Sequence, residues 1–585
     1  MNLSVEKIGK TGLTLLLAIT AFVFWNNYYP AHLLYHEQYQ LFLFDGAYLW
    51  ERLSVPEGFA DYIAEFLTQF YYHPWMGALI LSFLLTAIQL LCWALVKKFG
   101  TLYIYYPLSF IPVFVLWHYL ADENAMLSLA VAILIVLIAG NLYFLIKNTR
   151  LRLIYALGCI PVLYWLAGTI VYVFIGWVVL SILIEAYRTR TYFSPLFCSL
   201  GLIAWGILIP LVTAYFLQYP LLRLLRGLEY YRFPEVFPNI IYAIGLLLVL
   251  IPVVSSLFPL WNKRIGVIIE VVLVACWGYN YVKSGCDFSK EESMKYDWMV
   301  REKQWNEIIR MAESKTPTSP YSVTCLNLAL GMTGQMGDRM FEFYQNGTEG
   351  LLAKYQRDFT SPLPTSEAFY YLGMINTAQR FTFEAMEAIP NFRKSTRCFK
   401  RLAETNLING QYQVAAKYLH ALSKTLFYKD WAEETLGYLG NEKKINAHPE
   451  WGWLRKARYT EDFLFSDREM DMMLGLLYQH NYQNKLAFEY LLAYVMHQRD
   501  IDKFMRYYPL GAHSDYDHIP KHYQELLVYV WTQTHNSWKG MPWSIYPDVM
   551  RDIMDFAKIF STQSNAREYL KQRYGQTYWN YLLLN

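Results

Sequence analysis

The chain begins with long apolar segments and ends in a half where charged residues recur every few positions. Up to about Tyr281 only short polar stretches interrupt the apolar runs, whereas Asp, Glu, Lys and Arg are frequent beyond Lys283. A membrane-crossing helix needs about 20 apolar residues, because its backbone amides must be satisfied within the segment. The pattern predicts an all-α protein with a polytopic transmembrane domain over 1–282 and a soluble helical domain over 283–585.

Nine segments of the first domain are apolar enough to be expected as spans. The fifth and sixth form one apolar stretch of about 34 residues, in which only Gly168 and Thr169 indicate a turn. The expected spans lie near 11–29, 75–96, 103–120, 126–146, 153–168, 170–186, 195–217, 238–259 and 265–281.

Basic residues in the connections predict the orientation. Lys and Arg in short loops are retained on the cytoplasmic side of a membrane. About eleven of them fall in one alternating set of loops and four in the other. The N-terminus is therefore expected inside, and nine crossings place the second half outside. The same rule favours splitting 153–186, because the basic loops on its two sides share a side only if an even number of crossings separates them.

The first outward loop, 30–74, contains both apolar and acidic residues. Apolar residues such as Phe44 and Trp50 alternate with Glu37, Asp45 and Glu51 at helical spacing. This pattern predicts two amphipathic helices along the membrane surface, with those carboxylates facing water.

Charged residues of the outward loops supply the candidate chemistry. Arginine binds phosphate through two parallel hydrogen bonds, and a nearby carboxylate can act as a base towards a hydroxyl. One hypothesis is therefore a site for a lipid-linked phosphate; the other is that these charges simply pair with one another at the interface. The candidates are Glu37, Asp45, Asp122 and Glu123 as acids and Arg223, Arg226 and Arg232 as phosphate ligands.

Glu270 stands apart, because it lies inside the last expected span. A carboxylate there is costly unless it is paired or wetted. A proton or ion path is one interpretation. Helix packing or a partner near Lys263 is favoured, since no matching set of buried charges accompanies Glu270.

The second half shows apolar residues at three- and four-residue spacing and no strand alternation. Two stretches, 402–422 and 474–491, resemble degenerate tetratricopeptide repeats, and a weaker copy centres on Leu372, Gly373 and Ala385. Stacked helix pairs form a curved surface that suits peptides or protein partners. Plain helical hairpins are the alternative.

The sequence gives little support for nucleic-acid binding, a disulfide framework or a metal site. The net charge is +3, and no stretch combines basic with aromatic residues, so the sequence does not indicate a nucleic-acid-binding surface. Cys286, Cys325 and Cys398 cannot all pair with one another, so at most one bridge forms, such as Cys286 to Cys325. The run HSDYDHIPKHY holds zinc-type residues, but Pro520 interrupts any single helical face, so a loop before a helix is favoured. No metal or other cofactor is expected.

Three runs of the sequence carry a resemblance to an uncharacterised family of multi-pass membrane proteins from Bacteroides-like bacteria. They are HEQYQLFLFD, PEGFADYIAEFLTQFYY and NKLAFEYLLAYVMHQRDIDKF. This resemblance implies a Gram-negative inner membrane and a periplasmic second half, and it brings no catalytic residues.

A looser likeness is to the GT-C glycosyltransferases, which use polyprenyl-linked donors and place an acidic residue in the first outward loop. It implies Asp45, or else Glu37, as the base and Arg223 and Arg226 on the donor phosphate. Paired acids often seen in that loop are missing here. The sequence thus predicts an inner-membrane protein whose helical-repeat domain binds or scaffolds envelope components, with a lipid-linked glycosyltransferase as the alternative.

Overall fold

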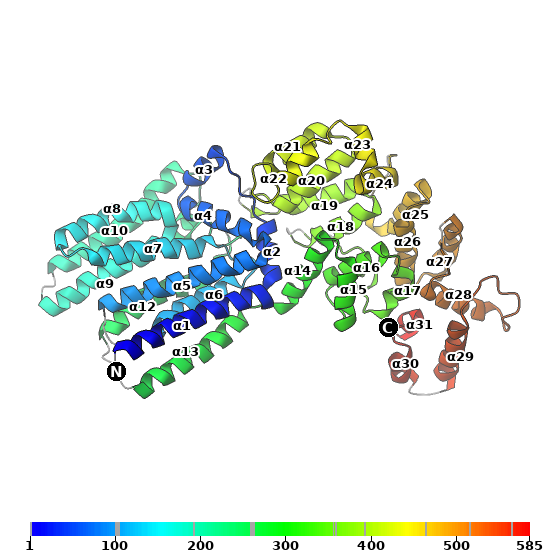
Figure 1. Cartoon of the computed structure of the whole chain (residues 1–585), viewed down its shortest axis with the longest axis horizontal. Helices are drawn as coiled ribbons and strands as arrows, with labels where there is room; N and C mark the ends of the chain where they lie inside the picture. Colours follow the sequence, from blue (N-terminus) through cyan, green and yellow to red (C-terminus); the bar gives the residue numbers. More distant parts are fainter. Residues whose placement is uncertain are drawn as a thin grey trace. The chain divides into compact units, whose positions relative to one another are not determined.

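The computed structural model is helical throughout the residues it describes, apart from one isolated bridge between Ala125 and Tyr231 (Figure 1). This confirms the all-α prediction. The described residues are 3–99, 106–190, 193–233, 235–257, 264–354, 356, 360–390, 393–461, 465–513, 516–562 and 566–584.

The chain divides into two compact units. Unit 1 comprises Met1–Glu291, Ile389–Arg397 and Ala421–Asp430, and unit 2 comprises Glu292–Ala388, Cys398–His420 and Trp431–Asn585. Two short segments of the charged second half therefore belong to the apolar unit, beyond the segment 1–282 that hydropathy delimits.

Unit 1 is a bundle of long helices. Helix α5 packs against α1, α7 and α12, so it lies at the centre of the bundle. Fully buried residues such as Trp25, Leu85 and Phe174 form its core. The long helices are α1 (Leu3–Val23, extended by η1, Phe24–Tyr28), α5 (Pro74–Phe99), α6 (Ile111–Leu120, preceded by η4, Pro107–Phe110), α7 (Ser128–Leu145), α8 (Thr149–Ala167), α9 (Val171–Thr189), α10 (Phe193–Phe216), α12 (Asn239–Leu257) and α13 (Arg264–Ser284).

Six helical stretches in the described residues are long and apolar enough to cross a membrane, so the predicted number of nine is corrected. Each expected position holds a helix, but 107–120 and 239–254 are shorter apolar helices. The stretch 149–189 is one of the six candidates, although it consists of two helices, α8 and α9, with a turn between them. Gly168 makes this turn with a φ of 62°.

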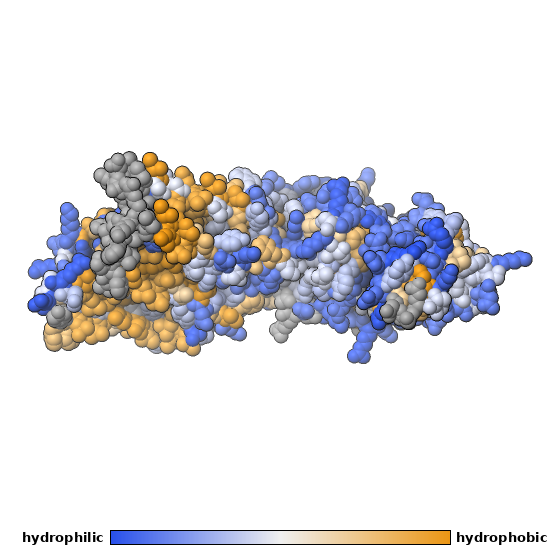
Figure 2. All heavy atoms as spheres, turned by 90° about the horizontal axis from the view of Figure 1, so that it is seen from below, coloured by the Kyte–Doolittle hydropathy of each residue, from blue (hydrophilic) through white to orange (hydrophobic). Residues whose placement is uncertain are grey.

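The outer faces of the bundle are apolar. Leu15, Leu16, Ile19, Ile268 and Leu273 all expose more than half of their surface. Figure 2 shows apolar residues gathered over unit 1, whereas the visible surface of unit 2 is mainly hydrophilic. Contiguous apolar surface of this extent suits hydrocarbon rather than water.

The segment 30–74 differs from its prediction. It forms α2 (Pro30–Gln38), α3 (Gly46–Leu53), α4 (Gly58–Thr68) and η2 (Gln69–Tyr72) instead of two surface helices. Trp50 is exposed as expected, but α2 is buried, so the expectation that Glu37 faces water is wrong. The hydropathy pattern of one helix does not reveal which other elements cover it, and α2 packs against η2, α5 and η1.

Unit 2 consists of short helices in antiparallel pairs. Helices packed against each other include α15 (Trp305–Ser314) with α16 (Pro320–Met332), α18 (Pro362–Leu372) with α19 (Ile375–Glu387), and α25 (Met470–His480) with α26 (Lys485–Gln498). The first repeat-like stretch falls on α20 (Thr396–Ile408) and α21 (Tyr412–Leu422), and the second on α25 and α26. The helices are confirmed, and their tetratricopeptide character stays a prediction.

The remaining helices of unit 2 complete the stack. They are α14 (Phe288–Arg301), α17 (Met336–Arg339), α22 (Lys429–Leu436), α23 (Glu442–Ala447), α24 (Pro449–Ala457), α27 (Ile501–Tyr507), α28 (Lys521–Thr534), α29 (Pro547–Thr562), α30 (Ala566–Tyr574) and α31 (Tyr578–Leu584), of which α14 and α22 begin in unit 1. No disulfide joins any of the seven cysteines, which all lie among the described residues, so the bridge from Cys286 to Cys325 does not form.

Gly168→Ala tests the turn between α8 and α9. A Cβ at this position would lie 2.7 Å from Glu57 Oε2 and from the Tyr230 hydroxyl, and the backbone has a positive φ. We expect the free energy of unfolding to fall by at least about 1–3 kcal/mol, which is the cost of a strained backbone. Thermal unfolding of the full-length protein in detergent measures it.

Gly158→Ala is the matched control, because Gly158 lies inside α8, the helix that ends at this turn, and no atom lies within reach of a Cβ there. Alanine favours a helix by about 1 kcal/mol over glycine. An unchanged or higher melting temperature is therefore expected for Gly158→Ala. Similar melting temperatures for the two variants would show that the turn does not require glycine.

Candidate functional site

Several connections of unit 1 meet at one end of the bundle. The Glu57 backbone amide donates to the Trp165 carbonyl at 3.0 Å, and the Met126 amide donates to the Tyr230 carbonyl at 3.0 Å. The Tyr230 hydroxyl accepts a hydrogen bond from the Ile170 amide at 3.2 Å. Loops that the sequence assigns to the outward set thus lie together.

The Glu57 carboxylate connects two of these loops by hydrogen bonds. It precedes α4 in a left-handed conformation with φ of 71° and is 1% exposed. Its carboxylate accepts the backbone amides of Leu228 and Glu229, each at 3.1 Å. Burial, followed by the charge of Glu229, raises the pKa of Glu57 well above its usual range. The two amide donors are what makes this burial tolerable.

Arg393 is the centre of the site. It lies in the returning segment Ile389–Arg397 of unit 1 and is 6% exposed. Its Nη2 donates to Asp61 Oδ1 at 2.7 Å and to Glu229 Oε2 at 2.8 Å, and its Nη1 donates to Glu65. One guanidinium therefore connects the segment Ile389–Arg397 to α4 and to the loop before α12, although more than 150 residues separate Arg393 from Glu229 in sequence.

Arg52 is the second cation of this cluster. Its Nε and Nη2 donate to the two carboxylate oxygens of Glu65 at 3.0 and 3.1 Å, and its Nε lies 3.7 Å from Asp61. The Tyr48 hydroxyl also donates to Glu65. We call Arg52, Asp61, Glu65, Glu229 and Arg393 the buried charge cluster.

Burial and the neighbouring charges set the pKa values of Arg393 and Glu65. Burial alone would lower the pKa of Arg393, but Asp61, Glu229 and Glu65 outweigh that effect and hold the pKa well above its ordinary value. Burial and the neighbouring Asp61 raise the pKa of Glu65, which Arg52 and Arg393 oppose. Removing one partner from such a network leaves an uncompensated buried charge, so the arrangement fixes the loops that carry it.

The returning segments make further contacts beside the cluster. The hydroxyls of Ser395 and Thr396 donate to the Gln38 carbonyl at 2.6 and 3.3 Å. The Tyr428 hydroxyl donates to Glu37 Oε1 at 2.8 Å. Glu37, a predicted base, is therefore a buried acceptor in this packing.

Asp45, the other predicted base, has a structural role in this arrangement. Its carboxylate caps α3 by accepting the Ala47 amide at 2.9 Å, and it forms an ion pair with Lys424. The hydrogen bond from Lys424 is the main reason that the pKa of Asp45 lies below its usual value. Neither contact of the carboxylate involves a predicted phosphate ligand.

The three predicted phosphate-binding arginines lie in different environments. Arg223 lies 5.5 Å from the Tyr219 ring, and Arg226 is exposed. Arg232 is buried against the rings of Tyr35 and Tyr39 at 5.5 and 5.3 Å. Desolvation lowers the pKa of Arg232. The arginines therefore do not present one shared cationic surface.

The remaining predicted acids are also accounted for. Asp122 accepts the Tyr231 hydroxyl at 3.0 Å, and burial raises its pKa. Glu123 forms an ion pair with Lys290. Glu270 is half-buried on α13, and its Oε2 has no hydrogen-bond partner among the described residues.

The histidine-rich run of unit 2 supplies no described metal site. Asp515 lies outside the described residues, and no group of three ligand-type residues within the described ones is arranged for a metal. His518 lies 3.2 Å from Asp338, and His522 lies buried 3.0 Å from Glu525.

A small polar groove of 170 Å³ lies in unit 2, where the ends of several helices meet. Asn409 Nδ2 donates to Asn376 Oδ1 at 2.8 Å, and Arg458 Nη1 donates to Asn409 Oδ1 at 2.8 Å. Met473 and Leu476 form an apolar wall beside this chain of hydrogen bonds. We call this the unit 2 groove.

Comparison with known proteins assigns the chain to a family but not to an activity. A family of unknown function, DUF6057, matches residues 6–585. The chain belongs to this family. No curated protein and no solved structure matches. Both units lie within the one family match, and no catalytic residue is inherited from it.

Sequence reasoning missed the buried charge cluster. Asp61 and Glu65 stand four residues apart on α4, so they share a helix face inside an otherwise apolar segment, which was a usable signal. Nothing around Arg393 distinguishes it from other arginines of the charged half. The pairing becomes visible only once the chain folds back.

Arg393→Met tests the cluster. Replacing the central cation leaves three buried carboxylates with Arg52 as the remaining cation of the cluster, so we expect the free energy of unfolding to fall by about 3–5 kcal/mol. Thermal unfolding of the full-length protein in detergent measures the change.

Arg310→Met is the control, since Arg310 forms an exposed ion pair with Glu307. Exposed pairs contribute less than about 1 kcal/mol. Equal melting temperatures for Arg393→Met and Arg310→Met would contradict a stabilising role for the cluster.

Proposed function

We propose that this chain is an integral protein of the bacterial cytoplasmic membrane whose second unit binds a peptide segment of a cell-envelope protein on the periplasmic side. Unit 1 is the membrane anchor in this proposal, and the unit 2 groove is the binding site. The proposal needs no cofactor and no chemical step.

The apolar surface and the distribution of basic residues support the membrane anchor. Six helices have the necessary length and composition. Lys10 and Lys97 lie against the same Trp93 ring, at 4.8 and 5.7 Å, so two of the basic loops lie together. Cytoplasmic retention of such loops leaves the end with the buried charge cluster on the periplasmic side.

The single observation that carries the binding role is the unit 2 groove. Side-chain amides of Asn376 and Asn409 match the donors and acceptors of an extended peptide backbone. Arg458 adds a cation for a carboxylate, and its Nε has no hydrogen-bond partner among the described residues. Met473 and Leu476 offer an apolar contact for a side chain.

The size of the groove favours a peptide over a small molecule. Its 170 Å³ is below the ~300–1,000 Å³ of typical small-molecule and cofactor pockets. One or two residues of an extended segment fill such a space, and helix pairs stacked beside it provide the longer surface that a protein partner contacts.

The alternative is a GT-C-like glycosyltransferase that uses a polyprenyl-phosphate-linked sugar at the outer face of the membrane. It has less support, because the Asp45 carboxylate contacts Lys424 and the α3 backbone. A catalytic base must reach the proton that it removes.

Site-specific photocrosslinking in the native host tests the proposal. A photoreactive phenylalanine analogue replaces Tyr459, which lines the unit 2 groove, or Tyr482, a partly exposed tyrosine outside it. We expect a crosslinked product of one defined mass from position 459 and none from 482. Mass spectrometry identifies the partner and the crosslinked peptide.

Asn376→Ala provides the second arm, because Asn376 is exposed and its loss leaves the core intact. Combined with the analogue at 459, it should reduce the crosslinked product severalfold at equal protein level. Products of equal yield from 459 and 482, or none from either, would contradict the binding role of the groove.

A further inference from the structure

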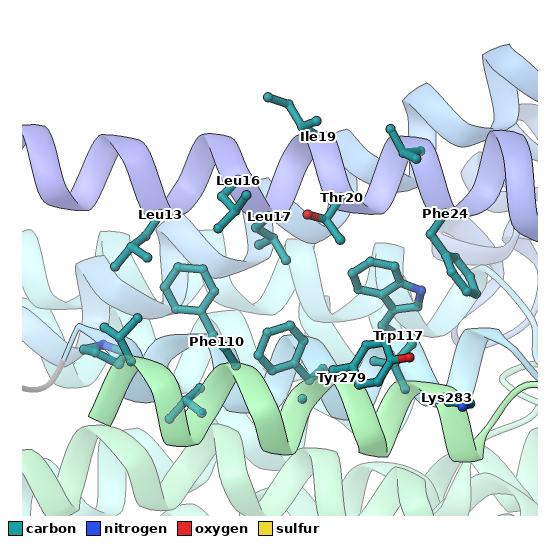
Figure 3. A pocket seen from close by; sticks show the side chains of 18 of the residues that line it. Leu13, Leu16, Leu17, Ile19, Thr20, Phe24, Phe110, Trp117, Tyr279 and Lys283 are labelled. Atoms are coloured by element: carbon teal, nitrogen blue, oxygen red, sulfur yellow. The ribbon is translucent and has the colours of Figure 1, made fainter. Parts of the chain in front are cut away.

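An apolar groove of 660 Å³ runs along unit 1 between α1, α13 and the segment formed by η4 and α6 (Figure 3). Leu13, Leu17, Phe110, Phe114 and Val274 line most of its length. Its volume lies within the ~300–1,000 Å³ of typical ligand sites. The groove is therefore large enough for a hydrocarbon chain.

Two polar groups lie at one end of this groove. Trp117 is 3% exposed, and its indole N–H has no hydrogen-bond partner among the described residues. Lys283, in the last turn of α13, is exposed and lies 6.0 Å from the Tyr279 ring. Figure 3 places Trp117, Tyr279 and Lys283 towards the same end.

A buried N–H without a partner costs free energy, so an acceptor at this position would be stabilising. A cation beside it favours an acceptor that carries negative charge. Apart from Thr20, Tyr28 and Tyr279, the rest of the lining is apolar and suited to hydrocarbon. The groove therefore combines an apolar channel with one site for an anionic oxygen.

We propose that this groove binds one membrane phospholipid with a net anionic head group. One acyl chain lies along Leu13, Leu17 and Val274, and the phosphate lies at Lys283, where an oxygen of the lipid accepts from Trp117. A transmembrane helix of a partner is a poorer occupant, because its backbone acceptors are already used within the helix.

The position of the polar end agrees with this occupant. Lys283 is followed by Ser284, where α13 ends, and Trp117 lies one turn before the end of α6. Both groups thus lie at helix ends, the depth at which lipid head groups meet an integral protein. The proposal is independent of the unit 2 groove.

Native mass spectrometry of the full-length protein in detergent tests the proposal. Phosphatidylglycerol and phosphatidylcholine with identical acyl chains are added separately, so that only the head-group charge differs. We expect one phosphatidylglycerol to be retained at a collision energy that removes phosphatidylcholine. Lys283→Gln should weaken retention of phosphatidylglycerol roughly tenfold, the loss expected for a charge-assisted contact.

Two further variants define the site. Ala275→Phe fills the groove from an exposed position and should abolish the retained lipid. Lys98→Gln removes the same charge from the end of α5, outside the groove, and should leave retention unchanged. Retention at the wild-type level in Lys283→Gln or in Ala275→Phe, or a second protein chain in the groove in place of lipid, would overturn the proposal.

Discussion

Burial of the Arg393 guanidinium is the constraint on which the architecture of unit 1 depends. A cation withdrawn from water must be surrounded by carboxylates and hydrogen-bond acceptors. Asp61, Glu65 and Glu229 provide them, and Arg52 balances part of their charge. Asp61 and Glu65 lie on α4 and Glu229 lies in the loop before α12, so satisfying one charge fixes the relative positions of two connections and a returning segment.

The same constraint explains why the hydropathy boundary and the structural boundary differ. Hydropathy separates the chain where long apolar runs stop, but a buried ion network requires polar residues inside an apolar unit. The segments Ile389–Arg397 and Ala421–Asp430 supply them. A polar sequence in this chain is therefore not evidence that a segment belongs to the water-exposed half.

The sequence predicts local structure well and distant pairing poorly. Apolar runs locate every helix of the bundle, and Gly168 locates the turn between α8 and α9, because both depend on neighbouring residues. Six rather than nine stretches of the described residues have the length and composition of a span, since apolar composition does not set helix length. Glu37 and Asp45 are predicted as candidate bases, yet their partners Tyr428 and Lys424 lie far along the chain. No periodicity reveals such contacts.

We propose that unit 1 crosses a membrane with the buried charge cluster at its periplasmic end. Single cysteines at Glu51, an exposed residue beside the cluster, and at Arg150, an exposed residue of a basic loop, test it in a background that lacks the native cysteines. Spheroplasts are treated with a membrane-impermeant maleimide. We expect labelling at position 51 and protection at position 150 until the membrane is permeabilised; labelling of both positions, or the reverse pattern, would contradict this topology.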